Sequence, residues 1–161
     1  MEMPPIPFRL CADARKDKLQ SFNDRAEIRW FGFRGSFAEP AWAEIEFERV
    51  ETGALGGGGT AAINGGAIAA GFDAAFVLAG LGHYDCGTVV TLELAVQFLS
   101  LARAAQPLVF RAGVLRSSRG FAFARGALIA QGTAGAAFAT ATAMIAPSQS
   151  SGRAPHAVRN T

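Results

Sequence analysis

The sequence predicts an α+β fold in which an antiparallel sheet covers one long apolar helix. Residues 61–82 are almost without charge and are long enough for such a helix. Four segments that alternate apolar and polar positions follow, separated only by short turns. Strands joined by short turns pair antiparallel, and a helix that is apolar all round must be covered by a sheet or by another subunit.

Composition limits the class of protein. The length of 161 residues predicts one domain, and 50% hydrophobic with 17% charged residues excludes a disordered chain. The net charge of +2 is too small to predict a nucleic-acid partner. Cys11 and Cys86 form no C-x-x-C pair, and the N-terminus has no basic segment followed by an apolar one. We therefore expect reduced thiols, no signal peptide and a cytoplasmic protein.

Before the helix, the sequence predicts little regular structure. Residues 12–19 are compatible with a short helix, and residues 26–38 mix aromatic and charged side chains in a pattern typical of irregular chain with at most a short strand. Residues 42–50 alternate and predict a half-exposed strand. We expect residues 1–38 to form an N-terminal extension of a domain that spans 39–147.

Residues 64–81 are expected to form the buried helix. A membrane span of this length is the alternative, but Asp73 lies in the middle of the segment and no Lys or Arg flanks it. The glycine run before the helix also matches G-x-G-x-x-A, the dinucleotide-binding pattern, at Gly56, Gly58 and Ala61. That fold requires alternating strands and helices, which one long helix followed by strands does not provide.

The segments after the helix predict four strands. The first places five apolar residues on one face, and the third places Phe121, Phe123, Ala127 and Ile129 on one face. Residues 148–161 are polar and are expected to form a disordered tail. The predicted strands are residues 88–99, with Val90, Leu92, Leu94, Val96 and Phe98 on one face, then 107–116, 121–130 and 134–146.

The helix and strands resemble a known family. Residues 64–73, NGGAIAAGFD, are similar to the His-Gly-Gly segment that opens the central helix of hotdog-fold acyl-CoA thioesterases, including the acidic residue on that helix. Residues 91–99 resemble the next strand, 100–103 its Arg-Pro-Ala turn, and 121–146 the last hairpin. The resemblance covers residues 42–147, with the PaaI-like branch as the most similar. It implies a curved sheet around the helix, dimers or dimers of dimers, and active sites at the dimer interface.

Asp73 is the main catalytic candidate. It is the only charged residue between Glu51 and Asp85. A carboxylate inside an apolar helix is costly unless it is paired or functional, so we expect it to be buried and to act as general base or nucleophile on a thioester. The alternative is a structural role in capping another backbone segment.

Gly65 and Gly66 open the helix, where N–H groups lack intrahelical partners and the helix dipole favours negative charge. Such a donor can hold the oxyanion of a tetrahedral intermediate. By resemblance, Gly65 supplies it, Gly66 binds substrate, and Asp73 comes from the partner subunit. The span from Asn64 to Asp73, about 13 Å along a helix, agrees with a two-subunit site. The alternative is that the glycines only allow tight packing.

Three further sites follow from the resemblance. Asn64 replaces the family's His and either caps the helix or contacts the thioester, while Gly58 stands where relatives often carry Asn. Thr91 matches a hydroxyl that orients the attacking water, although Thr is common in strands. From residue 103 onward the chain has seven Arg and no acid, so a turn with Arg116, Ser118 and Arg119 is either a contact for coenzyme A phosphates or a solvated hairpin tip.

These features predict a homo-oligomeric thioesterase that acts on an aryl- or medium-chain acyl-CoA. We expect no metal, no cofactor, no nucleic acid and no membrane partner. A non-catalytic acyl-CoA-binding protein on the same fold is the alternative, because Asn64 cannot titrate. A dehydratase would need a His paired with an acid, and His83 and His156 are poorly placed for that role.

Overall fold

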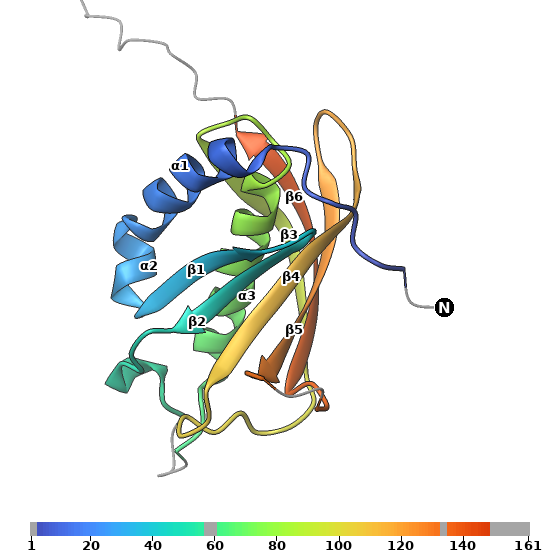
Figure 1. The fold of residues 1–161 in the computed structure, drawn as a ribbon. Coiled ribbons are helices and arrows are strands. Elements are labelled where there is room, and N and C mark those ends of the chain that lie inside the picture. Colours follow the sequence, from blue (N-terminus) through green and yellow to red (C-terminus); the bar gives the residue numbers. More distant parts are fainter. Residues whose placement is uncertain (1–2, 57–60, 133–134, 149–161) are drawn as a thin grey trace, which may run out of the picture.

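The computed structural model describes residues 3–56, 61–132 and 135–148. Within them, a six-stranded antiparallel sheet in the order β1-β2-β4-β5-β6-β3 curves around the long helix α3 (Figure 1). The predicted α+β class and the single central helix are confirmed. The strands are β1 (Phe33–Ala38), β2 (Trp42–Phe47), β3 (Thr88–Phe98), β4 (Leu108–Ser117), β5 (Ala122–Ala130) and β6 (Ala139–Ser148), and the helices are α1 (Ala12–Asn23), α2 (Ala26–Trp30), α3 (Gly65–Leu81) and the 3₁₀ turn η1 (Thr52–Ala54).

Helix α3 forms the centre of the core. Its Phe72, Phe76 and Leu78 side chains are fully buried against the concave side of the sheet. Gly71 allows this close packing, since a Cβ there would lie 2.2 Å from Phe110 Cζ. The apolar segment is therefore a core helix, as predicted. In the part of the chain that the structure describes, no helix meets the length and hydropathy needed to cross a membrane.

Residues 26–38 contain the short strand that the prediction allowed, but the rest is more regular than the predicted irregular chain. They form α2 and the edge strand β1, which pairs along its whole length with β2. Gly32, with a φ of +69°, makes the turn between them, and its carbonyl accepts hydrogen bonds from Glu48 and Arg49. Helix α1 also runs beyond the predicted residues 12–19, because buried Phe22 continues its contact with the core.

The segment before α1 crosses the end of the sheet. The backbone N–H groups of Ile6, Phe8 and Leu10 donate to Val114, Pro40 and Gly82. The Phe8 ring packs on Phe37 with a centroid distance of 5.0 Å, and the Arg15 guanidinium lies 4.5 Å from the same ring. The expected extension 1–38 is thus attached to the domain through backbone pairing and through its own strand.

Strand β3 changes face in its first half. Its register with β6 shifts between Thr91 and Glu93, so Val89 and Leu94 both face the helix. Val90 and Leu92, predicted to share a face with Leu94, are instead 39% and 55% exposed. The prediction of uninterrupted alternation is wrong because a β-bulge inserts one residue.

The last two strands also differ in detail from the sequence pattern. Ala122, Ala124 and Leu128 form the buried face of β5, so the predicted face with Phe121 and Phe123 is the outer one. Strand β6 begins at Ala139, later than predicted, and includes Ser148. Residues 149–161 of the expected tail, together with Gly58, lie outside the described residues.

Candidate active site

The start of α3 is fixed by Asn64. Its Oδ1 accepts a 2.7 Å hydrogen bond from the Ala67 N–H, and its Nδ2 donates to the carbonyls of Gly53 at 2.7 Å and Leu55 at 3.4 Å. The side chain therefore joins the helix to the η1 turn. This confirms the N-cap interpretation of Asn64 and engages both Nδ2 hydrogens. A direct contact with a thioester stays a prediction.

Gly65 and Gly66 leave two backbone donors open. Both residues are exposed, and within the described ranges neither N–H has a hydrogen-bond partner. A Cβ on Gly65 would lie 3.2 Å from Phe98 Cζ. The absence of a side chain at Gly65 therefore leaves space between the helix start and the Phe98 ring, through which a ligand can reach the Gly65 N–H. Two unpartnered N–H groups at the positive end of a 17-residue helix are suited to bind an anionic oxygen.

Asp73 does not have the expected burial. Its side chain lies on the face of α3 that points away from the sheet and is exposed in the single chain. The reason is helical phase, because neighbouring Phe72 and Ala74 face the core. Among the described residues Asp73 has no hydrogen bond or ion pair, and it borders a hollow of about 190 Å³ with Arg25 and Glu27. A second chain packed on this face would bury it.

Thr91 lies far from the glycines within one chain. Val89 packs near Gly80 and Phe98 near Gly65, so Thr91 belongs to the C-terminal end of α3. The distance along β3 from Thr91 to Phe98 is roughly 23 Å. The Thr91 Oγ1 is buried and, among the described residues, has no hydrogen-bond partner.

The turn with Arg116, Ser118 and Arg119 also lies at the far end. The Tyr84 hydroxyl, which follows α3, donates to the Ser118 carbonyl at 2.9 Å. The Ser118 hydroxyl bonds within its own turn, to the Phe121 carbonyl at 3.1 Å. The two arginines are exposed. Within one chain, the two arginines are thus separated from Gly65 by the length of α3, about 25 Å.

A cavity of about 690 Å³ adjoins the start of α3 and was not predicted from the sequence. Its walls include Trp30 and Phe31 from the end of α2, and its floor includes Gly66 and Ala67. Trp30 is 73% exposed and packs edge-on against Phe31. An ion pair between Arg49 and Glu51 closes another side. Trp30 and Phe31 come from the segment predicted as irregular chain, whereas Arg49 belongs to the predicted strand and Gly66 and Ala67 to the predicted helix. No pattern in the sequence indicated that these segments meet.

His83 is buried away from this region. It is 4% exposed, neither ring nitrogen has a hydrogen-bond partner, and its ring lies 5.8 Å from that of Phe8. Burial, with the charges of Arg9 and Arg15, lowers the pKa of His83 to about 4. Within residues 3–56, 61–132 and 135–148 it pairs with no acid, which disfavours a dehydratase site. Among the residues described, no group of three potential metal ligands occurs.

Strand β3 offers an open sheet edge beside the start of α3. Among the described strands it pairs with β6 alone, and the exposed apolar side chains of Val90, Leu92 and Phe98 lie along it. A long apolar edge strand is a template for pairing with another chain. If a second copy paired there, its own α3 would approach the exposed faces of Gly65 and Asp73.

Comparison with known proteins agrees with this architecture. The family model of the thioesterase superfamily matches residues 61–137, nearly half of the chain. A search of curated protein sequences gave no match. The match over 61–137 includes α3, β3, β4 and β5.

Three solved structures have a similar fold. The PaaI protein of the phenylacetic acid degradation operon of E. coli superposes with a TM-score of 0.72 at 15% identity, covering 86% of this chain and 96% of that one. A thioesterase family protein from Silicibacter pomeroyi gives 0.69 at 23% identity, covering 82% and 96%. Zebrafish thioesterase superfamily member 2 gives 0.68 at 19%, covering 86% and 99%. The fold is therefore the hotdog fold, and the resemblance to hotdog-fold thioesterases is confirmed.

Proposed function

We propose that this protein hydrolyses the thioester of an acyl-CoA. Its hotdog fold and the match of residues 61–137 to the thioesterase superfamily support the proposal. The observation that carries the proposal is the pair of unpartnered N–H groups of Gly65 and Gly66 at the start of α3. A thioester carbonyl that docks there gains donors for the negative charge that develops on its oxygen. Dinucleotide binding is not proposed, because the sheet is antiparallel and carries one central helix.

The reactive site is shared between two copies. Gly65 and Asp73 lie on one helix about 12 Å apart, whereas a general base must come within about 3 Å of its proton. Pairing of two chains through the open edge of β3 would place the Asp73 of one near the Gly65 of the other. It would also bury the exposed carboxylate. The protein is thus a homodimer or a dimer of dimers.

In the proposed reaction, Asp73 takes a proton from water and the resulting hydroxide attacks the thioester carbon. The carbonyl oxygen becomes an oxyanion held by the Gly65 N–H. The C–S bond then breaks, and coenzyme A leaves as a thiol after taking up the proton. Direct attack by Asp73, with later hydrolysis of the anhydride, is the second route to the same products. Thr91 orients the water, and the reaction requires no metal or cofactor.

The surroundings support an aryl- or medium-chain acyl group. The cavity of about 690 Å³ beside Gly66 is walled by Trp30 and Phe31 and has the volume of a typical small-molecule site. Arg116 and Arg119 are exposed and suited to the phosphates of coenzyme A bound by a neighbouring copy. The free cysteines fit a reducing compartment, and we propose the cytoplasm.

A non-catalytic acyl-CoA-binding protein is the second candidate. It is favoured by Asn64, whose amide is committed to the helix cap and supplies no proton to the leaving group. The two candidates differ in their need for Asp73, because binding an uncharged thioester requires no carboxylate.

The test is hydrolysis of a panel of acyl-CoAs, followed by detection of the free thiol. Asp73→Asn should lose at least about 100-fold in kcat/KM. Glu27→Gln is the matched control, because Glu27 borders the same hollow and should leave the rate unchanged. Equal rates of wild type and Asp73→Asn on every substrate would exclude the proposed chemistry, and binding without turnover would favour the second candidate.

A further inference from the structure

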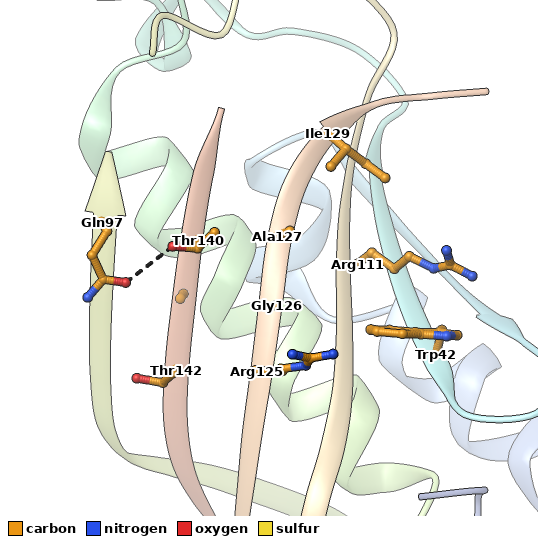
Figure 2. A pocket seen from close by; sticks show the side chains of 10 residues that line it. Trp42, Gln97, Arg111, Arg125, Gly126, Ala127, Ile129, Thr140 and Thr142 are labelled. Carbon is orange, nitrogen blue, oxygen red and sulfur yellow. Dashed lines mark hydrogen bonds between the residues drawn. The ribbon is translucent and has the colours of Figure 1, made fainter. Parts of the chain in front are cut away.

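The outer face of the sheet carries a second hollow, of about 320 Å³, on the side opposite α3 (Figure 2). It lies over β4, β5 and β6, with Trp42 contributed by β2 and Gln97 by β3. The strand register explains why the surface is sunken there. Ala127 sits between Arg111 on β4 and Thr140 on β6, so a methyl group forms the floor between long side chains. The volume is within the range of about 300–1,000 Å³ that is usual for small-molecule sites.

Arg111 is held in place at the wall of this hollow. Its guanidinium carbon lies 4.6 Å from the centroid of the Trp42 ring, and its Nε lies 3.1 Å from Glu44 Oε1 on the neighbouring strand. That Nε is buried and, despite the short distance, has no aligned hydrogen bond. The ring and the carboxylate thus fix the side chain. Because Nε is buried against Glu44, only the two terminal NH₂ groups of Arg111 can donate to a ligand.

The other walls also present donors. Arg125 extends toward Trp42 in Figure 2 and lies diagonally across the strands from Arg111. The Gln97 Oε1 accepts a hydrogen bond from Thr140 at 3.3 Å, which leaves the Gln97 NH₂ as a donor. Thr142 adds a hydroxyl, and the lining residues described include two arginines and no Asp or Glu. Glu44, which pairs with Arg111, lies just outside the lining. Guanidinium forks, an amide NH₂ and a hydroxyl together match the oxygens of a phosphate group.

From this geometry we infer that the hollow bounded by Trp42, Arg111 and Arg125 binds the phosphate group of a phosphate ester. The inference does not depend on the proposed hydrolysis, because the hollow lies across the sheet from the Gly65 amide and from Asp73. The nucleotide end of coenzyme A and other phosphorylated metabolites both carry such a group, and the shared recognition is the doubly charged phosphate beside an aromatic ring.

The test uses calorimetry and the fluorescence of Trp42. The chain has two tryptophans, so Trp30→Phe leaves Trp42 as the only tryptophan reporter. This protein is titrated with adenosine 3′,5′-bisphosphate, with inorganic phosphate and with uncharged adenosine. We expect saturable heat and a change in Trp42 emission with the phosphate probes, weakened by added salt, and neither with adenosine. A response to the bisphosphate alone would identify the nucleotide end of coenzyme A, and a response to both would identify phosphate itself.

Variants locate the site. Arg111→Gln should weaken binding by about tenfold or more, and Thr142→Glu should abolish it by placing a carboxylate in the hollow. Arg34→Gln is the control, because it removes the same charge from an exposed arginine on β1 that is not part of the lining. The inference is overturned if no phosphate probe binds, or if binding is unchanged in both Arg111→Gln and Thr142→Glu. Heat that is equally reduced by Arg34→Gln would also overturn it, since that result indicates general charge attraction.

Discussion

A mixture of two inactive variants, Gly65→Pro and Asp73→Asn, tests whether two chains share one active site. Gly65 is the first residue of α3 after the Asn64 cap. Proline is favoured at this position of a helix, and it has no N–H. The substitution therefore deletes the proposed oxyanion donor while leaving the helix intact. Gly65→Ala is the control that keeps the N–H, and its Cβ would meet only the edge of the exposed Phe98 ring.

The expected losses of activity follow from the positions of the two residues on the helix. Gly65 and Asp73 are separated by about 12 Å along α3, four times the distance of a hydrogen bond, so neither can serve the other in one chain. Loss of one oxyanion donor should lower kcat by about 10²–10³-fold. Loss of the general base should have an effect of about 10²–10⁴-fold.

Mixed dimers should recover part of this loss. In a dimer of one Gly65→Pro chain and one Asp73→Asn chain, one of the two sites combines an intact amide with an intact carboxylate. Random pairing makes about half of the dimers mixed, so about a quarter of the wild-type activity should return. The assay is thiol release after the two variants are unfolded together and refolded. No recovery in a sample shown to contain mixed dimers would refute the shared site, and full activity of Gly65→Pro alone would refute the oxyanion role.

Three further predictions concern stability and assembly. The pKa of His83 is about 4 in the folded protein and 6.5 in an unperturbed histidine. As the pH falls below 6.5, the His83 side chain therefore takes up a proton in the unfolded chain before it does so in the folded one. The stability that neutral His83 provides above pH 6.5 is thus lost as the pH falls toward 4. This loss, about 3 kcal/mol, should be absent in His83→Phe when urea unfolding is compared at pH 7 and pH 4, and parallel pH profiles of the two proteins would contradict it. Leu92→Lys should weaken dimerisation by about tenfold or more in sedimentation experiments, because it places like charges along the paired edges. Val50→Lys, at another exposed apolar residue, is the control and should leave dimerisation unchanged. A dimer that Leu92→Lys does not weaken would exclude β3 as the interface. Gly71→Ala should lower the free energy of unfolding by about 2 kcal/mol in urea, because the clash with buried Phe110 exceeds the roughly 1 kcal/mol gained in helix propensity. Gly87→Ala is the control, because its Cβ would meet no neighbour, and it should be nearly neutral. Equal urea midpoints for the two variants would show that the core adjusts freely.

The central helix and most strands were predictable because their signals are local. Asn64 caps α3, and no proline or charge other than Asp73 interrupts the apolar run that follows. The alternation in β4 and β5 likewise depends on side-chain order alone. The free amides of Gly65 and Gly66 could also be anticipated, since every helix start leaves such donors.

Features that depend on packing were not predictable. The bulge between Thr91 and Glu93 comes from pairing with β6, and it moved Val90 and Leu92 to the opposite face from the one predicted. The alternation in β1 extends over only a few residues, and the strand forms because β2 offers a partner along its whole length. Asp73 is exposed in the single chain, contrary to expectation, because a helix that is apolar nearly all round does not indicate which of its sides the rest of the chain leaves uncovered.

The remaining part of the site is assembled from distant segments. Trp30 ends α2, Glu51 follows β2, and Gly66 opens α3, yet the three border one cavity. The hollow around Trp42 and Arg111 likewise combines five strands. Neither arrangement has a spacing that a sequence motif could describe.

The pairing of β1 with β2 has a practical consequence for recognising related proteins. The matching family model begins at residue 61, so a comparison limited to that window would discard the first sixty residues as an unrelated leader. Those residues supply two of the six strands. A trimmed chain that starts at residue 39 would lose β1 and leave β2 as an unpaired edge of the sheet. The folded unit is therefore larger than the segment that the family model matches.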